Sequence, residues 1–271
     1  MSARAWREPQ HPRRPAGPGG GQFISKGGAV GWLLRTGASA GGQRPARGHD
    51  IRDQLDYDKL ARRIHQDNSG AGDVGLGDIY EVQGFDGRPL VVSKDEMDQL
   101  VASGHTQVFR GVADARDDSP FAGLTGTDFA HQFRVGDQHW PGYGMHGNGS
   151  YATSWELEAR GYSDATYEKF RTDPGEPEDW PGVLRIAVPP DARVVELGRL
   201  RSQWAQETAQ HRGAERRAVF ADMGRFAAAL GYDAIDLGPM STAGTQIPGA
   251  PPSRTHYVLL NRSILAVQEA Y

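Results

Sequence analysis

The first fifty residues constrain the fold of this chain more than any other feature, because they cannot supply a hydrophobic core. Residues 1–50 are rich in Gly, Pro, Arg and Ser and show no sustained apolar periodicity. Such a composition predicts a disordered segment. We therefore expect the folded part within residues 51–271, a length that suffices for one sizeable domain or two small ones.

This tail is also strongly basic. Positions 1–47 contain one acidic residue, Glu8, and the basic residues Arg4, Arg7, Arg13, Arg14, Lys26, Arg35, Arg44 and Arg47. A solvated tail is the simplest interpretation, and a basic arm that contacts nucleic acid or a partner surface is the alternative. The net charge of −4 for the whole chain argues against a protein dedicated to nucleic-acid binding.

Composition also excludes several kinds of site. The chain contains no cysteine, which excludes disulfides, cysteine-ligated zinc and a cysteine nucleophile. No apolar run approaches the ~18–20 residues that span a membrane, and we detect no export signal. We therefore expect a cytoplasmic protein, or a virion-associated one if it is phage-encoded. His139 and His146 lack a specific metal-ligand spacing, so no metal is expected.

Residues 51–104 are expected to form a helical lead-in. Apolar residues at helical spacing predict a helix over 51–65. Ser93 and Glu96 have the spacing of a capping box, which predicts a second helix that stops at Gly104. A β-rich run at 106–112 then begins the main domain, which we expect over residues 105–271.

The main domain shows short strands separated by helices and loops. The expected strands are 183–188, 194–195, 234–237 and 257–267, and the expected helices are 197–210 and 219–230. A long loop rich in Pro, Gly and Thr is expected at 238–252. This order predicts an α+β fold rather than a doubly wound parallel sheet.

Two glycine-containing segments are candidates for chemistry. Arg110-Gly111 closes the first β-rich run, and residues 144–154 read Gly-Met-His-Gly-Asn-Gly-Ser-Tyr-Ala-Thr-Ser. Asn148-Gly149 is typical of the turn of a β-hairpin. The glycines at 142, 144 and 147 also spell GxGxxG, but the residues before them do not read as the strand that a Rossmann loop requires. We therefore reject a Rossmann site.

Two further segments follow. Ser154 is expected to cap a short helix, and Tyr162 follows Tyr151 by eleven residues. Residues 255–265 read as an aromatic and aliphatic strand after the long loop. Each segment alone indicates only ordinary packing.

In this order the four segments resemble the ADP-ribosyltransferase superfamily, over about residues 106–268. Arg110-Gly111 is similar to the first motif of that family, and the segment 147–152 is similar to its second motif, Gly-x-Gly-x-Tyr-[Phe/Ala]. The spacing from Tyr151 to Tyr162 is similar to that of two stacking tyrosines in the poly-ADP-ribose-polymerase-like branch. Residues 257–261 resemble the strand of the third motif. The resemblance implies a split β-sheet core with helices.

The resemblance also implies that NAD is the substrate. Its nicotinamide–ribose bond would break through an oxocarbenium-like state. Arg110 would bind phosphate or ribose oxygens with its two-pronged guanidinium, and Gly111 would offer its backbone to the nicotinamide carboxamide. Tyr151 and Tyr162 would sandwich the cationic ring.

The remaining motif residues would shape this site. Gly147 and Gly149 would let the ligand lie against the backbone, and Ser154, with its neighbour Thr153, would hold the second-motif strand through hydroxyl hydrogen bonds. The long loop would lie near the acceptor substrate.

The third motif departs from the family pattern. A Glu in the family commonly bonds the ribose 2′-hydroxyl, and in our alignment His256 stands at this position. Glu269, after Gln268, is the alternative placement. A His exchanges hydrogen bonds but supplies no fixed negative charge, which favours single transfer or NAD hydrolysis over chain elongation.

The sequence therefore predicts a NAD-dependent mono-ADP-ribosyltransferase or a NAD glycohydrolase. The acceptor, a protein, a nucleic acid or water, is left open, as is the oligomeric state. The alternative is a catalytically inactive binding module or a phage structural component, which the missing Glu favours. The intact Arg-Gly and Gly-x-Gly-x-Tyr segments favour the enzyme.

Overall fold

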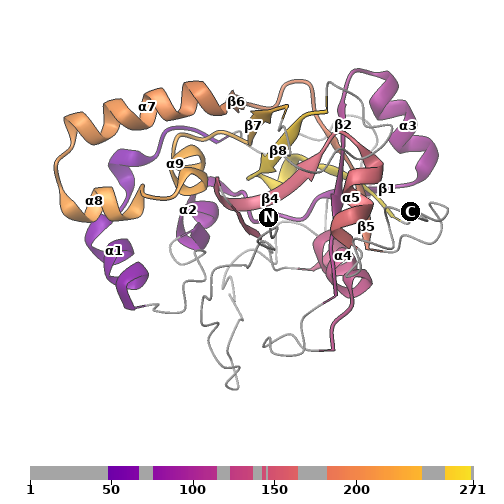
Figure 1. Cartoon of the computed structure of the whole chain (residues 1–271), viewed down its shortest axis with the longest axis horizontal. Coiled ribbons are helices and arrows are strands. Elements are labelled where there is room, and N and C mark those ends of the chain that lie inside the picture. Colours follow the sequence, from indigo (N-terminus) through magenta and orange to yellow (C-terminus); the bar gives the residue numbers. More distant parts are fainter. Residues whose placement is uncertain are drawn as a thin grey trace, which may run out of the picture.

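The computed structural model describes residues 48–66, 76–114, 123–136, 142–144, 146–163, 182–239 and 254–269 (Figure 1). Positions 1–47 of the predicted tail and most of the predicted loop 238–252 lie outside the described residues, so both remain predictions. The end of the tail is described and belongs to the folded body, since Arg193 Nη1 donates a hydrogen bond of 2.6 Å to Gly48 O.

The described strands form one mixed sheet of nine strands. Its order is β1-β9-β5-β2-β4-β8-β7-β6, and β3 pairs with β4 off this path. The strands are β1 (Leu90–Val92), β2 (Thr106–Gly111), β3 (Gly142–Gly144), β4 (Gly147–Thr153), β5 (Val183–Val188), β6 (Val194–Glu196), β7 (Ala234–Gly238), β8 (His256–Leu259) and β9 (Ala266–Gln268). The β1–β9 and β6–β7 pairs are parallel, and the others are antiparallel.

Helices cover the sheet at both ends. They are α1 (Tyr57–Gln66), α2 (Leu76–Gln83), α3 (Lys94–Ala102), α4 (Gly126–Val135), α5 (Glu156–Ser163), α7 (Leu197–Gln210), α8 (Ala214–Val219) and α9 (Met223–Ala229), with short 3₁₀ turns at Arg52–Gln54 and Arg262–Ile264. Figure 1 shows α1, α2, α7, α8 and α9 gathered at one end and α3, α4 and α5 at the other.

The prediction of a domain that mixes helices with a sheet is confirmed. Strand β5 and helix α7 have the predicted bounds. The capping box is also present, with Ser93 N donating to Glu96 Oε2 at 2.8 Å and Glu96 N donating to Ser93 Oγ at 3.3 Å. These elements depend on local signals, namely β-branched runs, helical periodicity and caps, which the sequence displays directly.

The helix predicted over 219–230 is confirmed as α9, but it begins later than predicted, at Met223. Helix α8 ends at Val219, and Asp222 begins α9 by accepting a hydrogen bond of 2.8 Å from Arg225 N. The apolar spacing continues across the break because Phe220 packs into the same hydrophobic cluster as α9. An Asp at an N-cap is a start signal that periodicity alone does not reveal.

Three helices were not predicted, namely α2, α4 and α8. Helix α4 has a capping box of its own, formed by Thr125 and Asp128. Helix α2 occupies the run around Ile79 and ends at Gln83, before Gly84 with φ of 71°.

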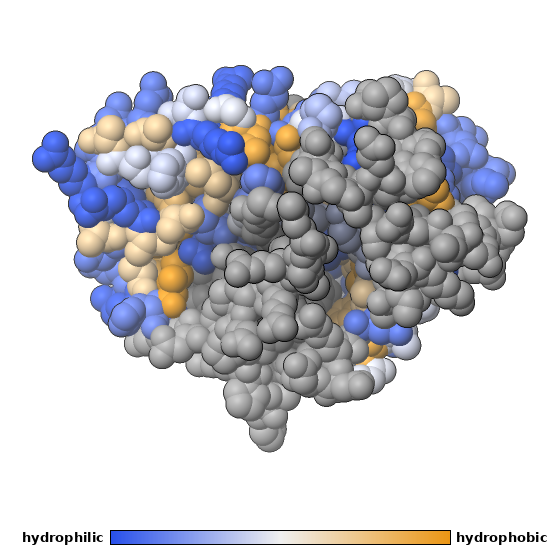
Figure 2. Space-filling view, viewed as in Figure 1, coloured by the Kyte–Doolittle hydropathy of each residue, from blue (hydrophilic) through white to orange (hydrophobic). Residues whose placement is uncertain are grey.

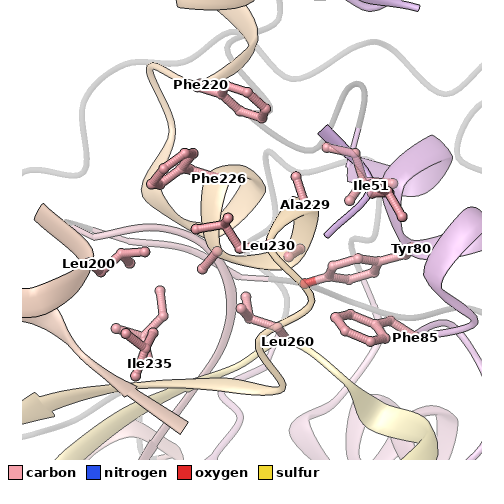
Figure 3. Packing of buried hydrophobic residues seen from close by; sticks show 14 of the residues in the cluster. Ile51, Tyr80, Phe85, Leu200, Phe220, Phe226, Ala229, Leu230, Ile235 and Leu260 are labelled. Atoms are coloured by element: carbon pink, nitrogen blue, oxygen red, sulfur yellow. The ribbon is translucent and has the colours of Figure 1, made fainter. Parts of the chain in front are cut away.

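The predicted lead-in packs onto the core of the main domain. Figure 3 shows Tyr80 and Phe85, from α2 and the turn after it, pointing toward Leu230 and Leu260 in the largest hydrophobic cluster. Strand β1 joins the sheet by pairing with β9. The described residues of 51–104 therefore share one sheet and one core with the described residues that follow.

The described surface is mainly polar where α7 and α8 face outward. Figure 2 shows hydrophilic side chains along that outer edge of the molecule. Of the helices in the described ranges, none has the length and hydrophobicity needed to cross a membrane.

Candidate functional site

The three strands that carry the candidate motifs lie side by side. Strand β2 ends with Arg110-Gly111, β4 begins at Gly147, and β8 begins at His256. Strand β4 lies between the other two. Thr153 lies opposite both Phe109 of β2 and His256 of β8, so the sheet brings together segments that are far apart in the sequence.

The sheet opens between β2 and β4 beside Gly111. Among the described residues, Phe109 and Thr153 make the single β2–β4 pair, whereas β2 pairs with β5 along its whole length. Val112 N donates a hydrogen bond of 2.8 Å to Gly182 O on the β5 side. Backbone groups alternate in direction along a strand, so the N–H and C=O of Gly111 point to the β4 side. They therefore border the opening.

One face of Gly111 is covered by α5. A β-carbon at this position would lie 1.8 Å from Ala159 O and 2.8 Å from Ser163 N, so glycine is required for the helix to pack here. The Arg-Gly dipeptide thus has a packing role as well as the predicted binding role. Helix α5 lies over the strand ends that form the candidate site.

Arg110 lies on the opposite face of β2 from Gly111, because side chains alternate along a strand. Its Cζ is 5.5 Å from the ring centre of Phe133 in α4, and its Nη1 is enclosed. Burial lowers the pKa of Arg110 to about 10, with Tyr80 acting in the other direction. The guanidinium therefore stays charged at neutral pH. The structure separates it from the face that carries Gly111, Thr153 and α5.

Tyr151 stands in the middle of β4 and is half-buried. Its hydroxyl accepts a hydrogen bond of 3.0 Å from His146 N and donates one of 2.8 Å to Gly147 O. Its ring packs against the largest hydrophobic cluster. Tyr151 therefore holds the β3–β4 hairpin together, in addition to the stacking that the sequence predicts.

The predicted hairpin is present, but the prediction that Asn148-Gly149 forms its turn is wrong. Gly144 lies opposite Gly147, and Tyr143 lies opposite Asn148, so the turn falls between Gly144 and Gly147. Asn148 and Gly149 belong to β4. A strand rather than a helix follows the GxGxxG pattern, which agrees with our rejection of a Rossmann loop.

Gly147 and Gly149 are approached closely by the protein itself. Gly147 has a φ of 94°, and a β-carbon on it would lie 2.6 Å from Gly224 N. A β-carbon on Gly149 would lie 2.2 Å from Val258 Cγ1. These glycines allow α9 and β8 to pack against β4, which is a reason for their presence apart from ligand binding.

A buried carboxylate that the sequence analysis missed anchors β4 to α9. Asp222 accepts hydrogen bonds from Asn148 N at 3.1 Å, from Asn148 Nδ2 at 3.1 Å and from Arg225 N at 2.8 Å. Burial has the largest effect on the pKa of Asp222 and raises it, although Arg225 and the backbone donors oppose this. Asp222 therefore fixes the start of the second-motif strand.

Ser154 and Tyr162 lie at the two ends of the α5 region. Ser154 Oγ accepts a hydrogen bond of 2.8 Å from Thr255 N, and Ser154 N donates one of 2.8 Å to Thr255 O. Ser154 thus extends the contact between β4 and β8. Tyr162, in the last turn of α5, is 58% exposed, so it presents most of its ring to the surroundings.

His256 lies beside a second carboxylate that the sequence analysis did not single out, Glu158 of α5. His256 Nε2 is 3.0 Å from Glu158 Oε2, and Thr153 Oγ1 donates to the same oxygen at 2.8 Å. Arg254 Nε is 3.9 Å from Glu158 Oε1. Glu158, Thr153 and His256 are all more than 90% buried. We call Thr153, Glu158, Arg254 and His256 the Glu158 cluster.

Burial acts to raise the pKa of Glu158, but its partners outweigh burial and hold that pKa below its ordinary value. The largest of their effects comes from His256. Helical periodicity places Glu158 on a helix but does not show that its side chain faces His256, which lies about a hundred residues later in the chain. The contact between Glu158 and His256 therefore depends on the tertiary packing of α5 against β8.

The alternative third-motif residue, Glu269, lies elsewhere. It follows β9, which is separated from β4 by β5 and β2. Glu269 N donates to Val92 O at 2.8 Å, and the preceding Gln268 contacts Arg185 at 3.2 Å. Glu269 therefore lies away from β2, β4 and β8, whereas His256 lies on β8.

The Asn-Arg pair after β8 holds the structure around it. Asn261 Nδ2 donates to Asp233 Oδ1 at 2.7 Å. Arg262 is fully buried and donates to Gly87 O at 3.0 Å and to Gly136 O at 3.0 Å. These residues join the third-motif strand to α4 and to the turn before β1.

A pocket of about 310 Å³ lies away from the candidate site, and its lining includes His105 before β2, Asp191 between β5 and β6, and Ser263 before β9. None of the predicted site residues lines it. In the described part of the chain, no group of three or more His, Asp or Glu side chains is arranged to hold a metal ion.

Comparison of the chain with protein-family models, with curated proteins and with solved structures finds no match.

Proposed function

We propose that the chain has the ADP-ribosyltransferase fold and cleaves NAD at the nicotinamide–ribose bond. It would transfer one ADP-ribose to a macromolecule or to water. The observation that carries this proposal is the adjacency of β2, β4 and β8, with the backbone of Gly111 facing the opening between β2 and β4. These are the three strands on which the family resemblance depends.

The opening offers a binding mode for nicotinamide. A strand edge presents one N–H donor and one C=O acceptor at Gly111, and a carboxamide needs one acceptor and one donor in return. The exposed ring of Tyr162 on α5 would then stack on the cationic nicotinamide. The ring of nicotinamide would thus be held by α5, and its carboxamide by β2, where this helix and this strand pack together.

The candidate residues favour transfer of a single ADP-ribose or hydrolysis. Elongation requires that a bound ADP-ribose be positioned as the acceptor, and the family uses a Glu of the third motif there. His256 takes that place in this chain. Charge stabilisation of an oxocarbenium-like state would have to come from a neighbouring group.

The test is release of nicotinamide from NAD by purified protein, with and without cell lysate as a source of acceptors. Tyr162→Ala removes the ring that would stack on the nicotinamide, and we expect release at NAD concentrations below KM to fall by about 3- to 30-fold. Tyr162→Phe keeps the ring, is the matched control and should leave release unchanged. Absence of release from the wild-type protein under both conditions would overturn the proposal.

A nucleic-acid acceptor is tested separately through the basic tail. Removal of residues 1–47 should abolish modification of DNA or RNA and leave NAD hydrolysis intact if the tail delivers the acceptor. Equal modification of DNA or RNA by both forms would show that the tail does not deliver the acceptor.

A second candidate function is an inactive binding module. The enclosure of the Arg110 guanidinium against Phe133 favours it, because this charge faces protein rather than the opening at Gly111. Such a module would show no affinity for NAD, or an affinity that Tyr162→Ala does not change.

A further inference from the structure

The Glu158 cluster brings three side chains to the carboxylate of Glu158 in α5. Thr153 comes from β4, His256 from the start of β8, and Arg254 from the residues just before β8. Thr153 also accepts a hydrogen bond of 3.2 Å from Trp155 N, which fixes its hydroxyl between strand and helix. Residues of the sheet and residues of α5 therefore both hold the cluster in place.

The cluster lies on the same face of the sheet as Gly111. Phe109 and Gly111 point to one face of β2, and Thr153, opposite Phe109, points to the same face. Helix α5 covers this face with two successive residues, since Ala159 O lies over Gly111 and Glu158 contacts Thr153. The same turn of α5 thus contacts Gly111 and carries the Glu158 carboxylate.

A buried carboxylate is unfavourable unless it is paired. Arg254 Nε lies 3.9 Å from Glu158 Oε1, and His256 Nε2 lies 3.0 Å from Glu158 Oε2. Both ring nitrogens of His256 are enclosed, and Nδ1 has no hydrogen bond from the described part of the chain.

We propose, on the basis of the proposed function, that Glu158 is a positioning residue that works with His256 in place of the third-motif Glu. Glu158 contacts His256 at Nε2, which leaves Nδ1 as the ring nitrogen that would take a proton from the acceptor. In the reaction the acceptor oxygen bonds to C1′ of the ribose, and the C1′–nitrogen bond breaks with its electron pair remaining on nicotinamide. The proton of the acceptor passes to His256 Nδ1, and Glu158 stabilises the resulting imidazolium.

The experiment measures kcat, KM and NAD affinity for nicotinamide release by the full chain. Glu158→Gln keeps the shape and the hydrogen bond to Thr153 but removes the charge, and we expect kcat to fall by about 10- to 100-fold while NAD affinity stays within about threefold. Glu156→Gln, in the same helix and outside the cluster, should behave as wild type.

A second variant separates this role from a purely structural one. The double variant Glu158→Gln/His256→Glu moves the carboxylate from position 158 to position 256, the place of the third-motif Glu. We expect this double variant to recover part of the kcat that Glu158→Gln loses. Unchanged kcat in Glu158→Gln, or equal losses of kcat and NAD affinity, would overturn the role of Glu158. If the wild-type protein neither binds nor cleaves NAD, the proposed function itself fails, which is a distinguishable result.

Discussion

The carbonyl oxygen of Ala159 lies so close over Gly111 that a β-carbon on Gly111 would be 1.8 Å from it. Backbone of a helix cannot move aside as a flexible side chain can. We therefore expect Gly111→Ala to lower the free energy of unfolding by about 1–3 kcal/mol, or more if α5 is displaced. Urea unfolding followed by circular dichroism measures this change.

Gly198 is the matched control for this prediction. It lies in α7, is exposed, and a β-carbon on it would meet nothing within 4 Å. Gly198→Ala should be neutral or raise the free energy of unfolding by up to ~1 kcal/mol, because alanine favours helix. Similar destabilisation by both substitutions would mean that the contact with Ala159 is not the cause.

Asp222 should be essential for the stability of the second-motif strand. Asp222→Ala removes the N-cap of α9, worth ~1 kcal/mol, and leaves buried donors of Asn148 without their acceptor, at ~1–3 kcal/mol. We expect the larger part of this loss to persist in Asp222→Ser, which restores a cap but does not reach both donors. Full recovery of unfolding free energy in Asp222→Ser would show that the cap alone matters.

The two buried carboxylates predict opposite dependences of stability on pH. The pKa of Asp222 is raised in the folded protein, mainly by burial, so its contribution is complete below 3.8 and is lost as the pH rises through the raised pKa. The pKa of Glu158 is lowered despite burial, so its contribution is present above 4.5 and is lost as the pH falls through the lowered pKa. Unfolding of the wild type, Asp222→Asn and Glu158→Gln from acid to neutral pH measures both slopes, and slopes of the same sign would contradict the assignment.

Local signals explain which parts of the fold the sequence predicts. The Ser93 capping box, the strand over 183–188 and the helix over 197–210 each depend on residues within a few positions of one another. Asn148-Gly149 has the composition of a turn, yet Asn148 is drawn into β4 by Asp222, which is 74 residues away. Turn propensity is outweighed there by a buried tertiary contact.

In the candidate site, too, local features could be predicted from the sequence and tertiary contacts could not. The residues of the family resemblance are visible in the sequence, and so is their order. The opposite facing of Arg110 and Gly111, and the carboxylate of Glu158 beside His256, depend on how α5 packs across β2 and β4. Sequence spacing carries no information on how a helix packs across a sheet. The contact between Glu158 and His256 therefore could not be predicted from the sequence.

A buried ion cluster away from the site provides a stability test. Glu207 of α7 is 3% exposed and contacts the guanidinium groups of Arg52 and Arg216. Both arginines keep some exposure, so we expect Glu207→Gln to cost less than the ~3–5 kcal/mol of a fully buried broken pair, about 1–3 kcal/mol. The exposed Glu215 of α8 is the control, and Glu215→Gln should change the unfolding free energy by less than about 0.5 kcal/mol.

Tyr162 provides the cleanest test of ring binding, because its 58% exposure separates ligand affinity from stability. Tyr162→Ala should leave the unfolding free energy nearly unchanged and weaken NAD binding by about 3- to 30-fold, the equivalent of the ~0.5–2 kcal/mol of a cation–π contact. Tyr162→Phe keeps the aromatic face and should bind NAD as the wild type does. Titration calorimetry with NAD, and separately with nicotinamide alone, measures the affinity of each variant. Equal weakening by Ala and Phe would assign the effect to the hydroxyl, and no weakening by Ala would remove Tyr162 from the site and leave the Gly111 backbone as the remaining contact to nicotinamide.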